Sequence, residues 1–298
     1  MVRRQRGHLQ VIAPGKAAVF GQPIAHSKSP ALHRAAYAAL DVPIDYQCLE
    51  AGAGQAPELA ERMREEAGWR GASVTMPLKN VMVPLMDSVS ERVQRLGVLN
   101  TIVVSQASGR VHLRGENTDV DGIIRALAEA GAQHVNTVAV LGAGSTATAA
   151  TEAFQAMGAT TVDYVVRDAG RATGVIELAT ELGCTATAID VAAAGQDLNR
   201  YDAVVSTLPP RAADALIADL QLQKLRPGTA LLDVAYDPWP SALATAWEAA
   251  GGMVIGGLSM LLHQAVEQVK MFSGVTEADW GQVTNVMCDA VGLPHPRT

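Results

Sequence analysis

At the centre of the chain stands Val138-Ala139-Val140-Leu141-Gly142-Ala143-Gly144-Ser145-Thr146-Ala147, in which an apolar run ends in a Gly-x-Gly turn. Residues 146–157 continue it as an Ala-rich, helix-forming segment. The pattern predicts the first strand, turn and helix of a dinucleotide-binding domain: Gly142 allows the tight turn, Gly144 lets the backbone approach a pyrophosphate, and Ala147 lets helix pack on strand. Gly-rich turns also occur in ordinary loops. The flanking strand and helix favour cofactor binding.

Length and composition narrow the class of protein. The 298 residues suit two domains better than one. Hydrophobic residues make up 49% of the chain and charged residues 18%, a composition that resembles a soluble α/β enzyme. The formal net charge of -7 argues against a nucleic-acid-binding surface.

Cysteine usage and hydropathy indicate the compartment. Cys48, Cys184 and Cys288 match neither a disulfide framework nor a metal motif, so we expect small buried residues, a reducing compartment and no metal. No apolar run approaches the roughly 20 residues of a membrane span, and residues 1–15 lack the core of a signal peptide and are expected to form a flexible tail. We therefore expect a cytoplasmic protein without nucleic-acid or membrane partners.

The first half of the chain alternates between strands and helices. Ser29 followed by Pro30 predicts an N-cap for a helix over 31–40. Ser88 and Glu91 predict a capping box for a later helix. The other expected elements are a strand over 17–20, a helix over 58–67, a strand over 71–75, and a hairpin that pairs 100–104 with 111–113.

The second half predicts a parallel sheet, because strands over 161–166, 185–189, 203–206 and 230–234 alternate with helices. We place the domain boundary at the polar loop 115–119, before a helix over 120–130. Helices over 258–271 and 277–290 are expected to return to the first domain. The predicted fold is thus α/β and two-lobed. Residues 16–118 and 258–298 form a substrate-binding domain, and residues 119–257 form a Rossmann-type, doubly wound dinucleotide-binding domain.

Several separated motifs cover most of the chain. In order they are Gly21-Gln22-Pro23-Ile24, His26-Ser27-Lys28-Ser29-Pro30, Val74-Thr75-Met76-Pro77-Leu78-Lys79, Gly97-Val98-Leu99-Asn100-Thr101, Asn117-Thr118-Asp119, Leu141-Gly142-Ala143-Gly144, Asp233-Val234-Ala235-Tyr236-Asp237-Pro238 and Gly257-Leu258-Ser259-Met260-Leu261-Leu262-His263-Gln264-Ala265. Together they resemble the shikimate dehydrogenase family, from about residue 19 to residue 272. The resemblance implies a reversible oxidation of shikimate to 3-dehydroshikimate with a nicotinamide cofactor, in aromatic biosynthesis.

The resemblance implies that Lys79 and Asp119 form the catalytic pair. A hydride that leaves a carbinol carbon needs a partner for the hydroxyl proton, and an ammonium beside a carboxylate can serve. Alone, Lys79 also fits a solvated lysine at a helix start, and Asp119 also fits an N-cap. Their places in two matching motifs favour catalysis.

Polar side chains of the same motifs suit a small polyol carboxylate, which is held by several hydrogen bonds. By resemblance Ser27 and Ser29 would hold the carboxylate, although Ser29 fits helix capping too. Gln264 also fits a satisfied core amide, and Tyr236 a packing residue with a bonded hydroxyl. The predicted substrate contacts are Ser27, Ser29, Thr75, Asn100, Tyr236 and Gln264.

Cofactor choice is expected at the end of the second strand of the dinucleotide-binding domain, where acidic residues bind the ribose of NAD and arginines accept the extra phosphate of NADP. Arg167 and Arg171 stand where, by resemblance, NADP-using members carry basic residues. We expect NADP. Asp168 between them keeps NAD open, and a solvated charge cluster is the other alternative. The remaining predicted cofactor contacts are Gly142, Ala143, Gly144, Ser145, Thr146, Ala147, Gly257 and Met260, the last of which packs against the nicotinamide or fills the core.

Two other functions stay open. One is a quinate/shikimate dehydrogenase that uses NAD; the resemblance gives quinate users Thr where this chain has Ser29, which favours shikimate. The other is a non-catalytic dinucleotide-sensing regulator on the same fold, which would be expected to have lost Lys79 or Asp119. The expected partners are the small-molecule substrate and, in a homodimer, a second copy of the chain; a monomer fits equally.

Overall fold

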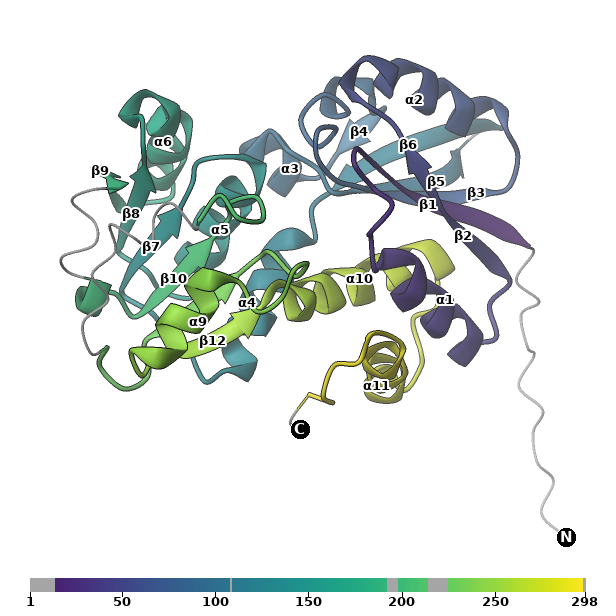
Figure 1. The fold of residues 1–298 in the computed structure, drawn as a ribbon. Coiled ribbons are helices and arrows are strands. Elements are labelled where there is room, and N and C mark those ends of the chain that lie inside the picture. Colours follow the sequence, from purple (N-terminus) through teal and green to yellow (C-terminus); the bar gives the residue numbers. More distant parts are fainter. Residues whose placement is uncertain (1–13, 108, 192–197, 214–224, 297–298) are drawn as a thin grey trace, which may run out of the picture.

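The computed structural model describes residues 14–107, 109–191, 198–213 and 225–296. Within them, two six-stranded sheets occupy the two halves of the molecule (Figure 1). Residues 1–13 of the expected tail lie outside the described part. Gly15, expected at the end of that tail, is instead the first residue of β1, where its N–H donates to the Pro43 carbonyl at 2.8 Å.

The first sheet is mixed. Its spatial order is β2-β1-β3-β5-β6-β4; β1 runs parallel to β2 and β3, whereas β5 and β6 form the predicted antiparallel hairpin. Its strands are β1 (Gly15–Gly21), β2 (Ile44–Glu50), β3 (Trp69–Val74), β4 (Ser88–Val89), β5 (Thr101–Ala107) and β6 (Arg110–Glu116). The helices are α1 (Ser29–Ala39), α2 (Ala56–Glu65) and α3 (Glu91–Leu96), with 3-10 turns η1 (Ala53–Gln55) and η2 (Val83–Leu85).

The second sheet is entirely parallel, as predicted. Its order, β12-β11-β10-β7-β8-β9, is that of a Rossmann fold that starts at β7. The strands are β7 (Thr137–Leu141), β8 (Thr161–Val166), β9 (Thr185–Asp190), β10 (Ala203–Ser206), β11 (Ala230–Asp233) and β12 (Met253–Gly256). The helices are α4 (Asp119–Glu129), α5 (Ser145–Ala156), α6 (Thr173–Glu181) and α9 (Ala242–Ala249), with 3-10 turns η3 (Ala169–Ala172) and η4 (Leu198–Arg200).

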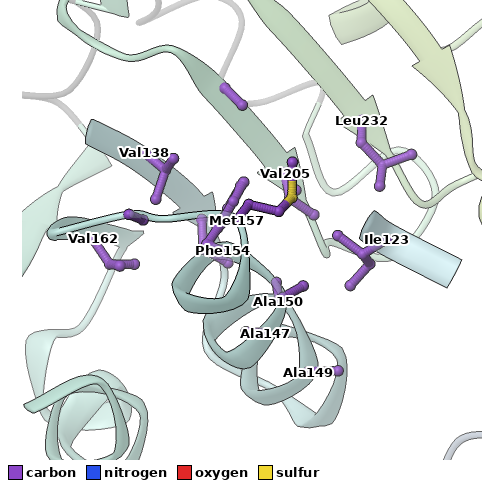
Figure 2. Packing of buried hydrophobic residues seen from close by; sticks show 14 of the residues in the cluster. Ile123, Val138, Ala147, Ala149, Ala150, Phe154, Met157, Val162, Val205 and Leu232 are labelled. Carbon is purple, nitrogen blue, oxygen red and sulfur yellow. The ribbon is translucent and has the colours of Figure 1, made fainter. Parts of the chain in front are cut away.

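Both faces of the second sheet are covered, because successive strand residues point to opposite sides. Val138 and Val140 of β7 join the core that holds α5, whereas Ala139 and Leu141 join the core that holds Trp247 of α9. Figure 2 shows the first of these cores, in which α5 lies on the sheet. The alanines of α5 allow this close approach. The packing fixes the Gly-rich turn at the carboxyl end of β7, a central strand of the sheet.

The C-terminal helices return to the first half of the molecule, as expected. α10 (Gly257–Ser273) follows β12 directly and crosses to the first sheet (Figure 1). Val266 and Val269 of α10 pack in the same core as Leu32 of α1. α11 (Trp280–Val291) adds Val283 and Met287 to that core.

An ion cluster also connects the two halves. Glu152 of α5, whose side chain is 9% exposed, accepts from Arg92 Nε at 3.1 Å and from Arg95 Nε at 3.0 Å. Arg92 Nη1 also donates to Asp121 of α4 at 2.7 Å. The two arginines belong to α3, so the cluster fixes the first half against α4 and α5.

Three expectations about local structure were wrong. Ser29 is the first residue of α1 and Lys28 is its N-cap, so Ser29 is free of the capping role. Ser88 lies in β4, and Ser90 instead caps α3 by accepting from the Val93 N–H at 3.3 Å. Cys48 is exposed, because it lies on the edge strand β2; Cys184 and Cys288 are buried.

Among the described residues, no helix is long and apolar enough to cross a membrane.

Candidate functional site

Two pockets adjoin between the sheets. Thr75, Lys79 and Thr146 line both of them. The larger pocket has a volume of about 770 Å³ and the smaller one about 190 Å³. A ligand in one pocket therefore meets a ligand in the other at Lys79.

The larger pocket is built around the Gly-rich turn between β7 and α5. Gly142 has φ +102°, and a Cβ there would lie 2.8 Å from Thr207 Oγ1, so only glycine fits. A Cβ on Gly144 would meet nothing within 4 Å and would extend into the open space of the pocket. The residues here thus leave room for a group that comes close to the backbone.

The N-terminus of α5 faces this space. Gly144 is its N-cap, and no side chain of the described residues caps it. The first-turn N–H groups have no intrahelical acceptor, and Thr148 is the first to bond back, to the Gly144 carbonyl at 3.1 Å. Free N–H groups and the positive end of the helix dipole suit a phosphate. The predicted residues Gly142, Ala143, Gly144, Ser145 and Thr146 line the pocket, whereas Ala147 is fully buried and packs in the core.

The far end of the larger pocket lies beyond β8. Arg167, Asp168 and Arg171 line it, and both arginines are exposed. The Asp168 carboxylate accepts from the Gly170 N–H at 3.0 Å, which caps η3. The arginines are therefore placed for an anion, while the acidic side chain between them is partly occupied by its own backbone.

The smaller pocket brings together most of the predicted substrate residues. Ser27 is not among the described residues that line the two pockets. Its Oγ accepts from the Ser29 N–H at 3.3 Å. The predicted residues that line the smaller pocket are Ser29, Thr75, Lys79, Asn100, Asp119, Tyr236 and Gln264, with Thr146, Gly257 and Met260 from the predicted cofactor set.

Lys79 and Asp119 form a buried pair in this pocket. Lys79 Nζ donates to Asp119 Oδ2 at 2.5 Å, and the two side chains are 12% and 6% exposed. Asp119 Oδ1 accepts from Asn100 Nδ2 at 2.8 Å. Asp119 is in the first turn of α4, whose N-cap is Thr118, so the helix dipole also stabilises the carboxylate. A lysine and a carboxylate in direct hydrogen-bond contact can pass a proton to or from a hydroxyl beside them.

Tyr236 reaches the smaller pocket from the segment after β11. Burial raises the pKa of the Tyr236 phenol, and a backbone hydrogen bond with Lys28 opposes that shift. The phenol is therefore protonated at neutral pH and can donate to a ligand oxygen. Because Lys28 precedes α1, this contact joins the two halves at the pocket.

Gly257 has a packing reason for being glycine. A Cβ there would lie 2.1 Å from the Val234 carbonyl oxygen, since α10 begins directly against the end of β11. Met260, one turn further on, lines the smaller pocket and belongs to the core of the second sheet. Its place in the core matches the alternative of core filling, and the contact with the nicotinamide stays a prediction.

Two further residues of the smaller pocket were missed from the sequence. Ser73 and Gln268 both line it. Ser73 is two residues before Thr75, and alternate strand residues share a face; Gln268 is four residues after Gln264 on α10, one turn along the same face. Periodicity around the predicted residues is the signal that finds them. Among the described residues, no group of three or more His, Cys, Asp or Glu could hold a metal.

A Gly-rich turn of a parallel Rossmann sheet and a buried lysine–carboxylate pair, on adjoining pockets, define a nicotinamide-dependent oxidoreductase of the α/β class. Residues 19–102 match the family model of the shikimate dehydrogenase substrate binding domain, and residues 74–252 match that of the alanine dehydrogenase/PNT C-terminal domain. The chain belongs to the shikimate dehydrogenase family, as its similarity to curated members shows.

The NADP(+) shikimate dehydrogenase of Methylobacterium radiotolerans is 33% identical over 272 residues, which is 88% of this chain and 93% of that relative. The pentafunctional AROM polypeptide of Schizosaccharomyces japonicus is 31% identical over 279 residues, 89% of this chain but 17% of that much longer polypeptide.

Solved structures of shikimate dehydrogenases have a similar fold. The Mycobacterium tuberculosis shikimate dehydrogenase is 36% identical with a TM-score of 0.80, and the match covers 93% of this chain and 100% of that one. The Thermus thermophilus shikimate 5-dehydrogenase, solved in complex with NADP(H) and shikimate, is 28% identical with a TM-score of 0.75, and the match covers 93% of this chain and 99% of that one.

Proposed function

We propose that this protein is an NADP-linked shikimate dehydrogenase, which reversibly interconverts shikimate and 3-dehydroshikimate in aromatic biosynthesis. The observation that carries the proposal is the position of Lys79, on the wall shared by the two pockets and 2.5 Å from Asp119. The larger pocket has the volume and the phosphate-binding features that a dinucleotide needs. The smaller pocket suits a small polyol carboxylate.

A bound NADP would supply the acceptor for the hydride that leaves the carbinol carbon of shikimate. The Lys79–Asp119 pair takes the hydroxyl proton as the hydride leaves, and returns it in the reverse direction. Lys79 also polarises the oxygen. Asn100 keeps the Asp119 carboxylate in place through the 2.8 Å hydrogen bond to Oδ1.

Substrate binding uses the polar side chains of the smaller pocket. Ser29, helped by Ser27, holds the carboxylate of shikimate at one end, and the pair Lys79 and Asp119 holds the reacting hydroxyl at the other. Thr75, Tyr236 and Gln264 hydrogen-bond the remaining hydroxyls. The residue types support these roles, and so does the gathering of all of them except Ser27 in one pocket. Ser27 is linked to that pocket through the Ser29 N–H, which donates to its Oγ at 3.3 Å.

Preference for NADP rests on Arg167 and Arg171, which are exposed at the end of the larger pocket. Arginine matches phosphate geometry with two parallel hydrogen bonds. The Asp168 carboxylate would repel the 2′-phosphate of NADP less strongly than a free carboxylate, because it accepts from the Gly170 N–H and caps η3. The NADP(+)-specific name of the Methylobacterium relative supports the same choice.

The proposal extends to domain roles. Residues 16–118 and 258–298 form the substrate domain, and residues 119–257 form the cofactor domain. In support, the core that holds α4 and α5 is built on the second sheet, and the core that holds α10 and α11 is built on the first. We further propose a cytoplasmic enzyme that acts as a monomer or homodimer.

An absorbance assay tests the function. The purified protein is offered shikimate or quinate, each with NADP or NAD, and the reduced nicotinamide is followed. The proposal predicts the highest rate with shikimate and NADP. No reduction of NADP with shikimate would refute the function, and a higher rate with quinate and NAD would replace it with the alternative activity.

A further inference from the structure

A buried carboxamide lies at the wall of the smaller pocket. Gln268 of α10 is fully buried, and its Oε1 accepts from Ser73 Oγ at 2.6 Å and from His33 Nε2 at 3.2 Å. Its Nε2 donates to Thr101 Oγ1 at 2.8 Å and to the Asn100 carbonyl at 3.1 Å. The side chain thus uses both donors and both acceptor positions.

The direction of these hydrogen bonds follows from one partner. A backbone carbonyl such as that of Asn100 can only accept, so Gln268 must turn its amide nitrogen toward it. Gln268 Oε1 then faces His33 and Ser73, which both donate. Burial lowers the pKa of His33 to about 3, so the ring is neutral, carries its proton on Nε2, and accepts from the Tyr37 hydroxyl at Nδ1.

The fixed direction is passed on through Thr101. Because Thr101 Oγ1 accepts from Gln268, its single proton is donated to Asn100 Oδ1, at 2.7 Å. Asn100 Oδ1 also accepts from the Thr118 N–H at 2.8 Å. The amide nitrogen of Asn100 must therefore face Asp119 Oδ1, at 2.8 Å.

We propose that Gln268 and Thr101 are positioning residues for the catalytic pair: they orient the Asn100 amide so that it donates to Asp119. The inference rests on the proposed function of Asp119. Thr101 is not among the described residues that line the two pockets, so it can affect a bound ligand only through its neighbours. Without Thr101 and Gln268, Asn100 Oδ1 keeps the Thr118 N–H but loses the Thr101 hydroxyl, so one donor instead of two holds the oxygen away from the carboxylate. An oxygen turned toward Asp119 would repel it from Lys79.

Thr101→Val and Gln268→Met test the relay, because each keeps the side-chain volume and removes hydrogen bonds. Thr229→Val is the matched control: Thr229 is buried like Thr101 and donates to the Arg226 carbonyl at 3.0 Å, away from both pockets. We expect both relay variants to lower kcat for shikimate oxidation by about tenfold to a hundredfold, as small misplacements of catalytic groups do. The KM for shikimate should rise less than about threefold in Thr101→Val, since a positioning residue makes no substrate contact.

Coupling separates positioning from general loss of structure. In an Asp119→Asn background, Thr101→Val should lower the remaining kcat by less than about twofold, because its effect passes through Asp119. The inference is wrong if Thr101→Val and Thr229→Val change kcat alike, or if the Thr101→Val and Asp119→Asn effects multiply.

A second readout needs no activity. The side-chain amide protons of Asn100, identified in ¹⁵N spectra by their loss in Asn100→Asp, should shift and exchange faster in Thr101→Val and stay unchanged in Thr229→Val. Unchanged Asn100 signals in Thr101→Val would overturn the relay even in an active enzyme. A wild-type protein that fails to oxidise shikimate would refute the proposed function, while these signals still decide whether the relay holds Asn100.

Discussion

Lys79 and Asp119 are 40 positions apart in sequence, yet Lys79 Nζ and Asp119 Oδ2 are 2.5 Å apart. Lys79 lies in the loop between β3 and η2, and Asp119 is the first residue of α4. The pair therefore forms where the first sheet meets the first helix of the second half. The two charges interact more strongly there than at the surface, because both side chains are largely removed from solvent.

Lys79→Ala should lower the turnover of shikimate by roughly 10²–10⁴-fold, the usual size of a general acid–base effect, with a much smaller change in KM. Asp119→Asn should also lose turnover, and the double variant should lose less than the product of the single effects. Steady-state kinetics at saturating NADP measures these losses. A large rise in KM with turnover intact would leave Lys79 as a binding residue only.

Replacing Arg167 and Arg171 together by Gln should weaken NADP far more than NAD, because each charge-assisted contact is worth about 1.5–3 kcal/mol. Dissociation constants for the two cofactors give the comparison. Asp168→Asn serves as a control, and its effect should be small because an amide oxygen can still cap η3. Equal losses of NADP and NAD affinity in the double variant would mean that the arginines form a solvated cluster.

His33 should make the free energy of unfolding depend on pH. Its pKa is about 3 in the folded protein against 6.5 for the free side chain, so between these values the unfolded chain binds a proton that the native state excludes. Stability from this group is complete above pH 6.5 and falls by about 1.4 kcal/mol for each pH unit below it. The aromatic neighbours Tyr37 and Tyr46 have raised pKa values and stay neutral there.

Urea unfolding of wild type and His33→Gln at several pH values between 7 and 4 isolates the effect of His33. The wild type should lose stability faster than the variant as the pH falls. Parallel curves would show that the imidazole is protonated in the native state.

Gly257→Ala should destabilise the protein, because the new Cβ would lie 2.1 Å from the Val234 carbonyl oxygen and force α10 away from β11. Overpacking of this kind costs about 1–3 kcal/mol. Gly174→Ala, in α6 with nothing within 4 Å of its Cβ position, is the control and should be neutral or stabilising by up to about 1 kcal/mol. Thermal unfolding compares the two, and equal melting temperatures would contradict the close approach.

Local patterns predicted the parts of the fold that depend on neighbours in sequence. The run from Val138 to Ala147 defines its own strand, turn and helix, and the strands over 161–166 and 203–206 match β8 and β10. Strand β2 was missed although its first four residues alternate between buried and exposed, and β12 was missed because it is a short strand between two helices. Ser88 was preferred to Ser90 as a cap because two serines compete within three residues.

The contact between Lys79 and Asp119 and most of the smaller pocket could be predicted from motifs, since each motif keeps its residues together. The relay behind them could not, because Gln268 meets His33 across 235 positions and Ser73 across 195. Such hydrogen bonds depend on how α10 crosses the first sheet. Ser27 lies outside the pockets for a local reason: in the turn before α1, its Oγ accepts from the Ser29 N–H, while Ser29 lines the smaller pocket.

The most direct measurement follows the hydrogen that moves between the two pockets. Shikimate that carries deuterium on the carbinol carbon at position 3 is incubated with NADP and the wild-type protein, and the mass of the reduced cofactor is determined. Because the pockets adjoin at Lys79, the account predicts NADPH that contains one deuterium, with the rate greatly lowered in Lys79→Ala. Reduced cofactor without deuterium, or no reduced cofactor, would contradict hydride transfer from shikimate at this site.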